Sequence, residues 1–530
     1  MTSRTPRDTF SRSSLLLLGG LSGVLAFQGG CAIVGSSSGS NGATATGGTS
    51  CVGNCTFISE QITPETRKEL IAKGITEAGL NQFFNDLGRQ NVPLNNLDHE
   101  LRDIAKNYLD HKTKIAALSS QDPDVTALIQ QARQAVEAVN FPLAERLFNE
   151  ASQRDEQAAQ NLQHTAATRL TSAAAAQAAN GDQQRVQLNF VNAQAYYRKA
   201  LQLLPPSDTE HRGPYLILRG ISLNEAGIRT KGADIQKFLG ESVAAYREAL
   251  TVYTKEQFSQ NWAMTQSNLG NALANQGTRT SGEAGIRLLG EAVTAYRGAL
   301  TVQTKEQLPQ DWALTQNNLG NVLTNQGKRA SGEAGTQLLA EAVQAYRAAL
   351  TVYTQAGLPQ GWAITQNNLG NVLRNQGTRT DGEAGISLLA ESVTAYREAL
   401  KVRTKDQLPQ QWAMTQSNLG NALANQGMRT SGETSTQLLA EAVTAYRDAL
   451  TVRTLAQLPQ DWAATQNNLG NALRDQGTRT GGEAGKVLIR QAINAYELAL
   501  QIRTREALPV QWEETMGNLK ITKQALEDMK

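Results

Sequence analysis

Between residues 206 and 530 the order of apolar and polar positions repeats every 50 residues. The stretch WALTQNNLGNVL, which begins at Trp312, has apolar residues at helical spacing, and close copies of it precede and follow. A second stretch, EAVQAYRAAL, which begins at Glu341, has the same spacing. Such spacing indicates amphipathic helices. Each period therefore predicts a helix A from about Trp312 to Asn325 and a helix B from Ala334, joined by a loop.

Two aromatic residues mark the period. A tryptophan recurs at Trp262, Trp312, Trp362, Trp412, Trp462 and Trp512, and a tyrosine at Tyr246, Tyr296, Tyr346, Tyr396, Tyr446 and Tyr496. Because one helix pair cannot bury its apolar face alone, neighbouring pairs must stack. We expect packing roles for Leu319, Gly320, Ala342, Tyr346 and Ala349. Trp312 is expected to pack against the preceding helix B and its connection, and ligand stacking is the alternative.

The connections carry two further recurrent features. Thr280 and Glu283 have the spacing of a capping box, which predicts the start of helix B, and the same pattern recurs at Thr380, Thr430 and Thr480. An arginine also recurs, at Arg229, Arg279, Arg329, Arg379, Arg429 and Arg479. We expect it to pair with a glutamate or a helix C-terminus. Anion binding is the alternative.

The first 55 residues differ from the rest. Residues 1–31 contain basic residues, an apolar run (Leu15–Phe27) and a Gly-Gly-Cys sequence ending at Cys31, which predicts a lipoprotein-type signal peptide with Cys31 as the lipidation site. Ordinary cleavage and a retained anchor are the alternatives. Residues 32–55 are rich in Gly, Ser and Thr and predict a flexible tether.

The tether contains the two remaining cysteines, Cys51 and Cys55. In an exported protein they favour a local disulfide. A metal site is the weaker interpretation because no further ligands stand nearby.

Leu319-Gly320 and Val322-Leu323 in helix A, with Ala342, Tyr346 and Ala349 in helix B, resemble the tetratricopeptide repeat (TPR) family. The resemblance is strong over residues 206–530 and weaker over residues 121–205, where Ala132, Ala144, Phe148 and Ala151 have the same steps. Residues 56–120 are predicted to form a separate N-terminal helical segment. The array departs from the family's 34-residue period. It resembles a lengthened bacterial variety and kinesin light chain repeats, with the extra residues expected in the connections.

The resemblance implies an all-α fold in which TPR-like helix pairs stack into a right-handed α-solenoid superhelix. It also implies that helix A lines a concave groove that binds a protein or peptide partner. In the family's geometry the positions of Asn317 and Asn321 are exposed there. An amide both donates and accepts hydrogen bonds, so a row of them suits an extended peptide.

The candidate groove residues form three groups. The first is Asn271, Asn321, Asn371, Asn421 and Asn471; the second is Asn317, Asn367 and Asn467; and the third is Arg374 and Arg474, which favour an acidic or carboxylate-ended segment. The alternative is that Asn318 and Asn321 bond to neighbouring helices and hold repeat to repeat.

Bulk composition excludes some functions. The chain has 50 Lys and Arg against 48 Asp and Glu, and this balance argues against a nucleic-acid partner. The four histidines lack metal-ligand spacing, and no catalytic or nucleotide-binding motif is present, so we expect no enzyme, metal or cofactor.

These features predict a scaffold that is exported to the bacterial cell envelope, held to the periplasmic or outer membrane surface by its lipid, and bound to a protein partner. A self-associating structural protein and a regulatory or sensor subunit are the alternatives. The charged end of the array, after Trp512, predicts a solubilising cap that opposes open-ended stacking.

Overall fold

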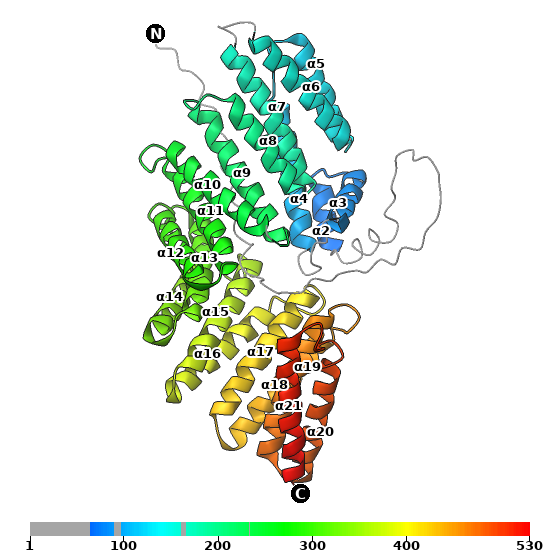
Figure 1. Ribbon diagram of the computed structural model, residues 1–530, viewed down its shortest axis with the longest axis vertical. Helices are drawn as coiled ribbons and strands as arrows, with labels where there is room; N and C mark the ends of the chain where they lie inside the picture. Colours follow the sequence, from blue (N-terminus) through cyan, green and yellow to red (C-terminus); the bar gives the residue numbers. More distant parts are fainter. Residues whose placement is uncertain (1–63, 90–96, 161–165, 233, 530) are drawn as a thin grey trace, which may run out of the picture. The chain divides into compact units, whose positions relative to one another are not determined.

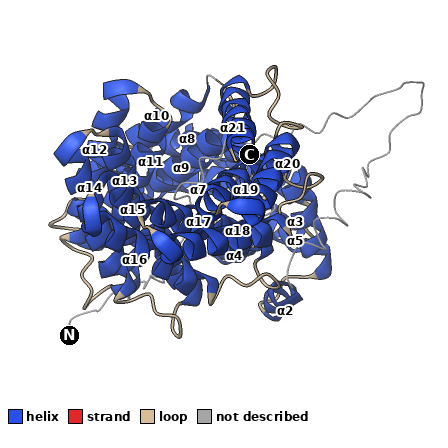
Figure 2. Cartoon of the chain, turned by 90° about the horizontal axis from the view of Figure 1, so that it is seen from below, coloured by secondary structure: helices blue, strands red, loops and turns tan. Residues whose placement is uncertain are grey.

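The computed structural model of the protein describes residues 64–89, 97–160, 166–232 and 234–529. The signal peptide, the tether and residues Cys31, Cys51 and Cys55 therefore lie outside the described residues. All regular structure in the described ranges is α-helical, in 20 helices (Figures 1 and 2). In this part of the chain no helix has an apolar stretch of the length and hydropathy that a membrane span needs.

The helices fall into an N-terminal group and a series of pairs. The first group is α2 (Pro64–Ala72), α3 (Glu77–Arg89) and α4 (Leu97–Ala116). Two pairs follow, α5 (Pro123–Glu137) with α6 (Phe141–Gln160) and α7 (Ala166–Val186) with α8 (Phe190–Leu203). The 50-residue repeats contain α9 (Thr209–Arg229), α10 (Asp234–Val252), α11 (Ser259–Thr278), α12 (Gly282–Leu300), α13 (Pro309–Arg329), α14 (Gly332–Leu350), α15 (Pro359–Arg379), α16 (Gly382–Leu400), α17 (Pro409–Arg429), α18 (Gly432–Leu450), α19 (Pro459–Thr480), α20 (Gly482–Ala499) and α21 (Pro509–Asp528).

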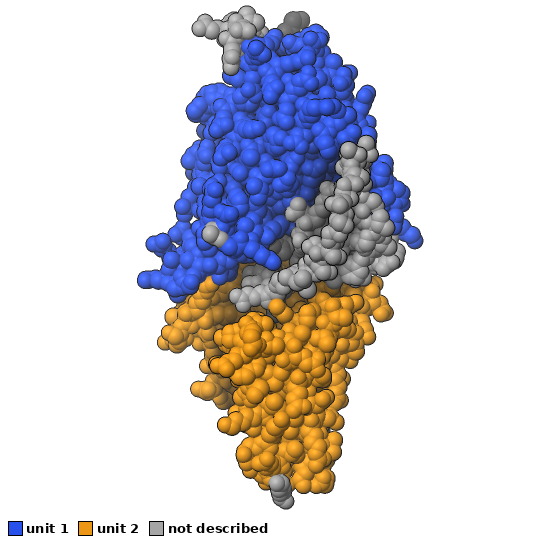
Figure 3. Space-filling view, turned by 45° about the vertical axis from the view of Figure 1, so that its right-hand side comes forward, with its two compact units in different colours: residues 1–25, 35–311 blue, residues 26–34, 312–530 orange. Residues whose placement is uncertain are grey.

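The described chain divides into two compact units at residue 311 (Figure 3). Within each unit, helices that follow one another in sequence pack side by side, as helix pairs and then between pairs. The fold class predicted from the sequence, stacked TPR-like helix pairs of the α-solenoid type, is therefore confirmed. The odd-numbered helices from α5 onward are the A helices, and the even-numbered ones are the B helices.

A close contact between glycine and tyrosine joins the two helices of each pair from α7 and α8 onward. A Cβ atom placed on Gly320 of α13 would lie 2.8 Å from the ring of Tyr346 of α14, and the same holds at 2.7 Å for Gly370 and Tyr396. Real Cβ contacts are not this short, so only glycine permits the approach. The tyrosine ring is fully buried in every repeat. The predicted packing roles of the glycine and the tyrosine are confirmed.

The extra length of the repeat lies in the helices, and the predicted loop after Asn325 is wrong. Helix α13 continues to Arg329 and α14 begins at Gly332, so only two residues separate them. A second glycine, Gly327, explains the continuation. Its Cβ would lie 3.0 Å from Leu339 and 3.1 Å from the carbonyl oxygen of Gly335, so the helices remain in contact beyond the first glycine.

The predicted capping box is also wrong. Helix α12 begins at Gly282, whose φ is +65°, and its N-cap residue Ser281 makes no side-chain capping hydrogen bond. The Thr280 hydroxyl instead donates to the carbonyl oxygen of Gln276 at 2.8 Å, near the end of the preceding helix. Thr380, Thr430 and Thr480 make the same bond to the residue four positions earlier. These threonines close helix A and do not open helix B.

The tryptophans pack where the sequence predicts, at the junction between repeats. Trp462 clusters with Leu450 of the preceding helix B and with Ala499 of its own helix B. A cation from the preceding connection also lies over the ring in some repeats, as Lys405 does over Trp412 at 5.7 Å. A structural role accounts for this position.

Helix α21 is the last helix of the described residues. Charged residues stand where other A helices contact their B helix: Lys520 replaces the packing glycine, and Glu513 and Lys523 replace an alanine and a leucine. All three side chains are exposed. The solubilising cap that the sequence predicts here stays a prediction.

The glycine–tyrosine contact can be tested by substitution. Gly370→Ala puts a methyl group 2.7 Å from the Tyr396 ring, and we expect it to lower the free energy of unfolding by about 1–3 kcal/mol. Gly517→Ala in α21 is the control, because nothing lies within 4 Å of its Cβ position. Helix propensity alone would raise stability there by up to about 1 kcal/mol. Urea unfolding followed by circular dichroism measures both, and equal effects of the two substitutions would contradict the assignment.

Candidate functional site

The asparagine that follows the packing glycine is held by the tyrosine of its own repeat. The Tyr346 hydroxyl donates to Oδ1 of Asn321 at 2.8 Å, and Tyr396 donates to Asn371 at 2.8 Å. The same bond occurs at Asn271, Asn421 and Asn471. Burial raises the pKa of these phenols, to about 12 for Tyr496, so they stay protonated and donate.

This bond fixes the direction of the amide. Because Oδ1 accepts from the buried hydroxyl, the NH2 group of the same side chain must point elsewhere. In the described chain, Asn321, Asn371, Asn421 and Asn471 donate no hydrogen bond from Nδ2, and each side chain is half-buried. Unit 2 therefore presents a row of four oriented N–H donors, one per repeat.

The second group of predicted groove residues is buried, and the prediction that they are exposed is wrong. Asn317, Asn367 and Asn467 are only 5%, 4% and 1% exposed. Their Oδ1 atoms accept from a threonine of the next repeat, as Asn317 does from Thr365 at 3.2 Å. A buried amide can hydrogen-bond to polar groups of a neighbouring repeat. The family's geometry alone does not distinguish such a buried amide from one that is exposed in the groove.

The third asparagine of the motif also connects repeats. Nδ2 of Asn368 donates to Oδ1 of Asn321 at 3.2 Å and to Oδ1 of Asn317 at 3.5 Å. Asn468 bonds to Asn421 in the same way at 3.2 Å. The alternative prediction, in which these amides hold one repeat to the next, is thus confirmed for the Oδ1 atoms of Asn317, Asn321 and Asn421, which accept hydrogen bonds from the next repeat. In unit 2 the Nδ2 atoms of Asn321, Asn371, Asn421 and Asn471 remain available to a partner.

The recurrent arginine binds the end of the preceding A helix, as predicted. Arg379 donates to the carbonyl oxygens of Gly327 at 2.6 Å and Lys328 at 3.0 Å. Arg429 makes the equivalent bonds to Gly377 and Thr378. The C-terminal carbonyls of an A helix have no partner within their own helix, and a cation there is favoured by the helix dipole.

The two predicted cationic groove residues differ in their surroundings. Arg474 is paired with the carboxylate of Asp475 at 2.9 Å. Arg374 has no acidic partner among the described residues, and its Nε atom is buried without a hydrogen bond. Lys328 lies nearby: desolvation, then the charges of Arg374 and Arg379, lower the pKa of its amine. Of these two positions, Arg374 is therefore the one whose positive charge no acidic side chain of the described residues compensates.

Unit 1 contains an equivalent of the Asn321 position that the 50-residue period does not predict, because its repeat lacks ten of the extra residues. In the pair α7 and α8, Gly181 contacts the ring of Tyr197, and Asp182 follows the glycine as Asn321 follows Gly320. The Tyr197 hydroxyl donates to Oδ1 of Asp182 at 2.6 Å. The sequence pattern that identifies Asp182 is a Gly-Asp pair followed by a tyrosine at the spacing usual in the TPR family.

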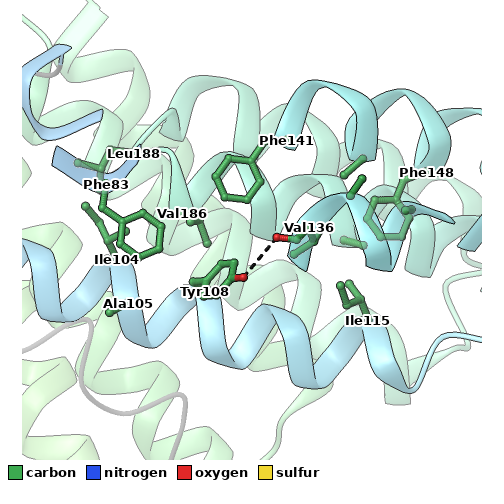
Figure 4. Close-up of a cluster of buried hydrophobic side chains, with 14 of the residues drawn as sticks. Phe83, Ile104, Ala105, Tyr108, Ile115, Val136, Phe141, Phe148, Val186 and Leu188 are labelled. Carbon is green, nitrogen blue, oxygen red and sulfur yellow. Dashed lines mark hydrogen bonds between the residues drawn. The ribbon is translucent and has the colours of Figure 1, made fainter. Parts of the chain in front are cut away.

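Unlike the later asparagines, Asp182 is covered by another helix. Nζ of Lys114, from α4, lies 3.2 Å from its carboxylate. His111 of α4 is fully buried beside it, against the ring of Phe148 (Figure 4 shows this core). Desolvation first, then the Lys114 charge, lowers the pKa of His111 to about 4, while the Asp182 charge opposes the shift.

Among the described residues no group of three or more His, Cys, Asp or Glu is placed to hold a metal ion. No protein-family model and no curated protein sequence matches the chain.

Two solved structures are similar in part. The TPR domain of P58(IPK) matches with 13% identity over 77% of this chain and 99% of that domain, at a TM-score of 0.20. A chain of the APC/C hetero-tetramer Cut9–Hcn1 matches with 13% identity over 87% of this chain and 99% of its own length, at a TM-score of 0.25. At such TM-scores the superpositions are poor, and the repeat type rests on the contacts within each helix pair.

The asparagine–tyrosine bond predicts a measurable coupling. Asn371→Ala leaves the buried Tyr396 hydroxyl without its acceptor, and we expect it to lower the free energy of unfolding by about 1–3 kcal/mol. Tyr396→Phe should cost less, and in the double variant the two effects should not add, because the second change removes no further bond. Urea unfolding of the three variants gives the coupling energy, and strict additivity would contradict the bond.

The buried histidine predicts a pH dependence. The pKa of His111 is lower in the folded than in the unfolded chain, where it is near 6.5, so its contribution is complete above pH 6.5 and is lost as the pH falls toward 4. Between pH 7 and 5 the loss amounts to about 2 kcal/mol. His111→Leu should remove this part of the dependence in urea unfolding, and an unchanged pH profile would refute the assignment.

Proposed function

We propose that the protein is a non-enzymatic scaffold that binds a protein partner on the exposed side of its A helices. We define the A-face as the surface formed by the residues one and four positions after the packing glycine of each A helix. In unit 2 it includes Asn321, Asn371, Arg374, Asn421 and Asn471. In the groove expected from the TPR family, this surface would line the concave side.

The row of oriented Nδ2 donors carries the proposal. Each amide is held by a buried tyrosine and faces outward, so the donors require little ordering when a partner binds. Amide N–H groups suit carbonyl and carboxylate oxygens, which every protein surface offers. Because each repeat contributes one donor, the row suits a long partner segment better than a small molecule.

The proposed location is the bacterial cell envelope. The apolar run Leu15–Phe27 and Cys31 support export and lipid attachment, and the Gly- and Ser-rich tether would hold the helical part away from the membrane. In this arrangement the scaffold would bind a partner next to a membrane surface.

The test separates binding from folding. Asn371→Asp, Asn421→Asp and Asn471→Asp together keep the oxygen that accepts from each tyrosine and replace each NH2 donor by an acceptor. We expect the triple variant to keep its melting temperature within a few degrees and to weaken capture of the partner from envelope extract at least tenfold.

The control is the same triple substitution at the buried positions Asn317, Asn367 and Asn467, which we expect to lower the melting temperature. Undiminished capture by a folded A-face variant would refute the proposal.

A further inference from the structure

The chain already contains one helix bound to its A-face. Helix α4 contacts the A helices α5 and α7, and it reaches the end of α9 through an ion pair between Glu100 and Arg229 at 2.9 Å. Figure 4 shows α4 with Ile104, Tyr108 and Ile115 against the buried cluster. The structure thus records how a helix lies on this surface.

The polar contacts of α4 follow one stripe of the helix. Asn107 accepts from Nη2 of Arg185 at 3.4 Å, His111 is buried between, and Lys114 donates to Asp182 at 3.2 Å. These three residues of α4 are four and three positions apart, the spacing at which helices present anchors to a surface. Their partners on α7 stand one and four positions after the packing glycine, which are the A-face positions.

The same pair of positions is repeated in unit 2. Asn371 and Arg374 of α15 follow Gly370 as Asp182 and Arg185 of α7 follow Gly181. The arginine is the same, and Asp182 and Asn371 both accept from the tyrosine of their own repeat. The two sites differ in one functional group: the second Asp182 oxygen is an acceptor for Lys114, whereas Asn371 presents an NH2 donor.

From this correspondence we propose that the A-face at Asn371 and Arg374 binds an amphipathic α-helix of the partner that carries acceptors two turns apart. This inference rests on the proposed function and specifies it. A carboxylate of the partner helix lies against Arg374, where Lys328 adds positive charge and no acidic side chain of the described residues compensates it. A second acceptor, seven residues on, receives the Asn371 NH2 group. The partner segment is therefore an acidic helix and not an extended strand.

The test uses peptides of the α4 sequence, residues 97–116, with a lactam between the side chains of Lys106 and Asp110 to hold the helix. The native peptide carries Asn107 and Lys114. The acidic peptide carries Asn107→Asp and Lys114→Glu. Fluorescence anisotropy measures the binding of both to the full chain.

We expect the wild-type chain to bind the acidic peptide at least tenfold more tightly than the native peptide. Asn371→Asp should reverse this order, because the new carboxylate receives Lys114 as Asp182 does. Arg374→Ala should weaken the acidic peptide about tenfold, while Arg474→Ala, at the site neutralised by Asp475, should change its affinity less than twofold.

Two controls make the inference falsifiable. A linear acidic peptide with His111→Pro cannot form the helix, and equal binding of it would overturn the helical mode. Asn421→Asp has no arginine beside it, since position 424 is Ala424, and should leave the order of the peptides unchanged. A chain that captures its partner through the A-face but ignores both peptides would refute this inference and leave the proposed function intact. Peptide binding in the expected order without partner capture would instead refute the proposed function and support the helix site.

Discussion

The contact between a glycine on helix A and a tyrosine on helix B is the constraint on which the rest of the structure depends. Only a residue without Cβ lets the tyrosine ring approach this close, as Gly320 does for Tyr346. The approach buries the ring and places its hydroxyl beside the next residue of helix A. Where an asparagine follows the glycine, the packing contact therefore also sets the orientation of its amide.

The lengthened repeat extends this arrangement along the helices. The second glycine, Gly327, keeps A and B together for further turns, and the chain then reverses over two residues. The additional turns of α13 carry Gly327, Lys328 and Arg329, whereas the position of Arg374 already has an equivalent, Arg185, in the shorter repeat of α7. A shorter repeat would have less A-helix surface on which a partner could lie.

Periodicity predicted the helix pairs, the packing glycine and the role of the recurrent arginine, because each of these depends on contacts repeated in every unit. Three predictions are wrong for local reasons. The first is the capping box, because the Thr280 hydroxyl bonds to the end of helix A and not to the start of helix B. The loop predicted after Asn325 is helical instead, because Gly327, although glycine disfavours helix interiors, permits a close tertiary contact. The TPR family's geometry predicts Asn317 at the surface, whereas a threonine of the next repeat satisfies it inside the stack. Sequence spacing specifies which residues share a face, but it does not specify what covers that face, and Asp182 beneath α4 is the clearest case.

In α13 and α15 the arginine that closes the A helix belongs to the following repeat, so this part of the stack has a direction. Arg379 donates hydrogen bonds to the carbonyl oxygens at the end of α13, and Arg429 donates to those at the end of α15. At the end of the array the equivalent position is Met529, which offers no charge to α19. The last carbonyl groups of α13 and α15 therefore receive these hydrogen bonds only while the following repeat is folded. Removal of the repeat that supplies Arg379 would expose the carbonyl groups at the end of α13 to solvent.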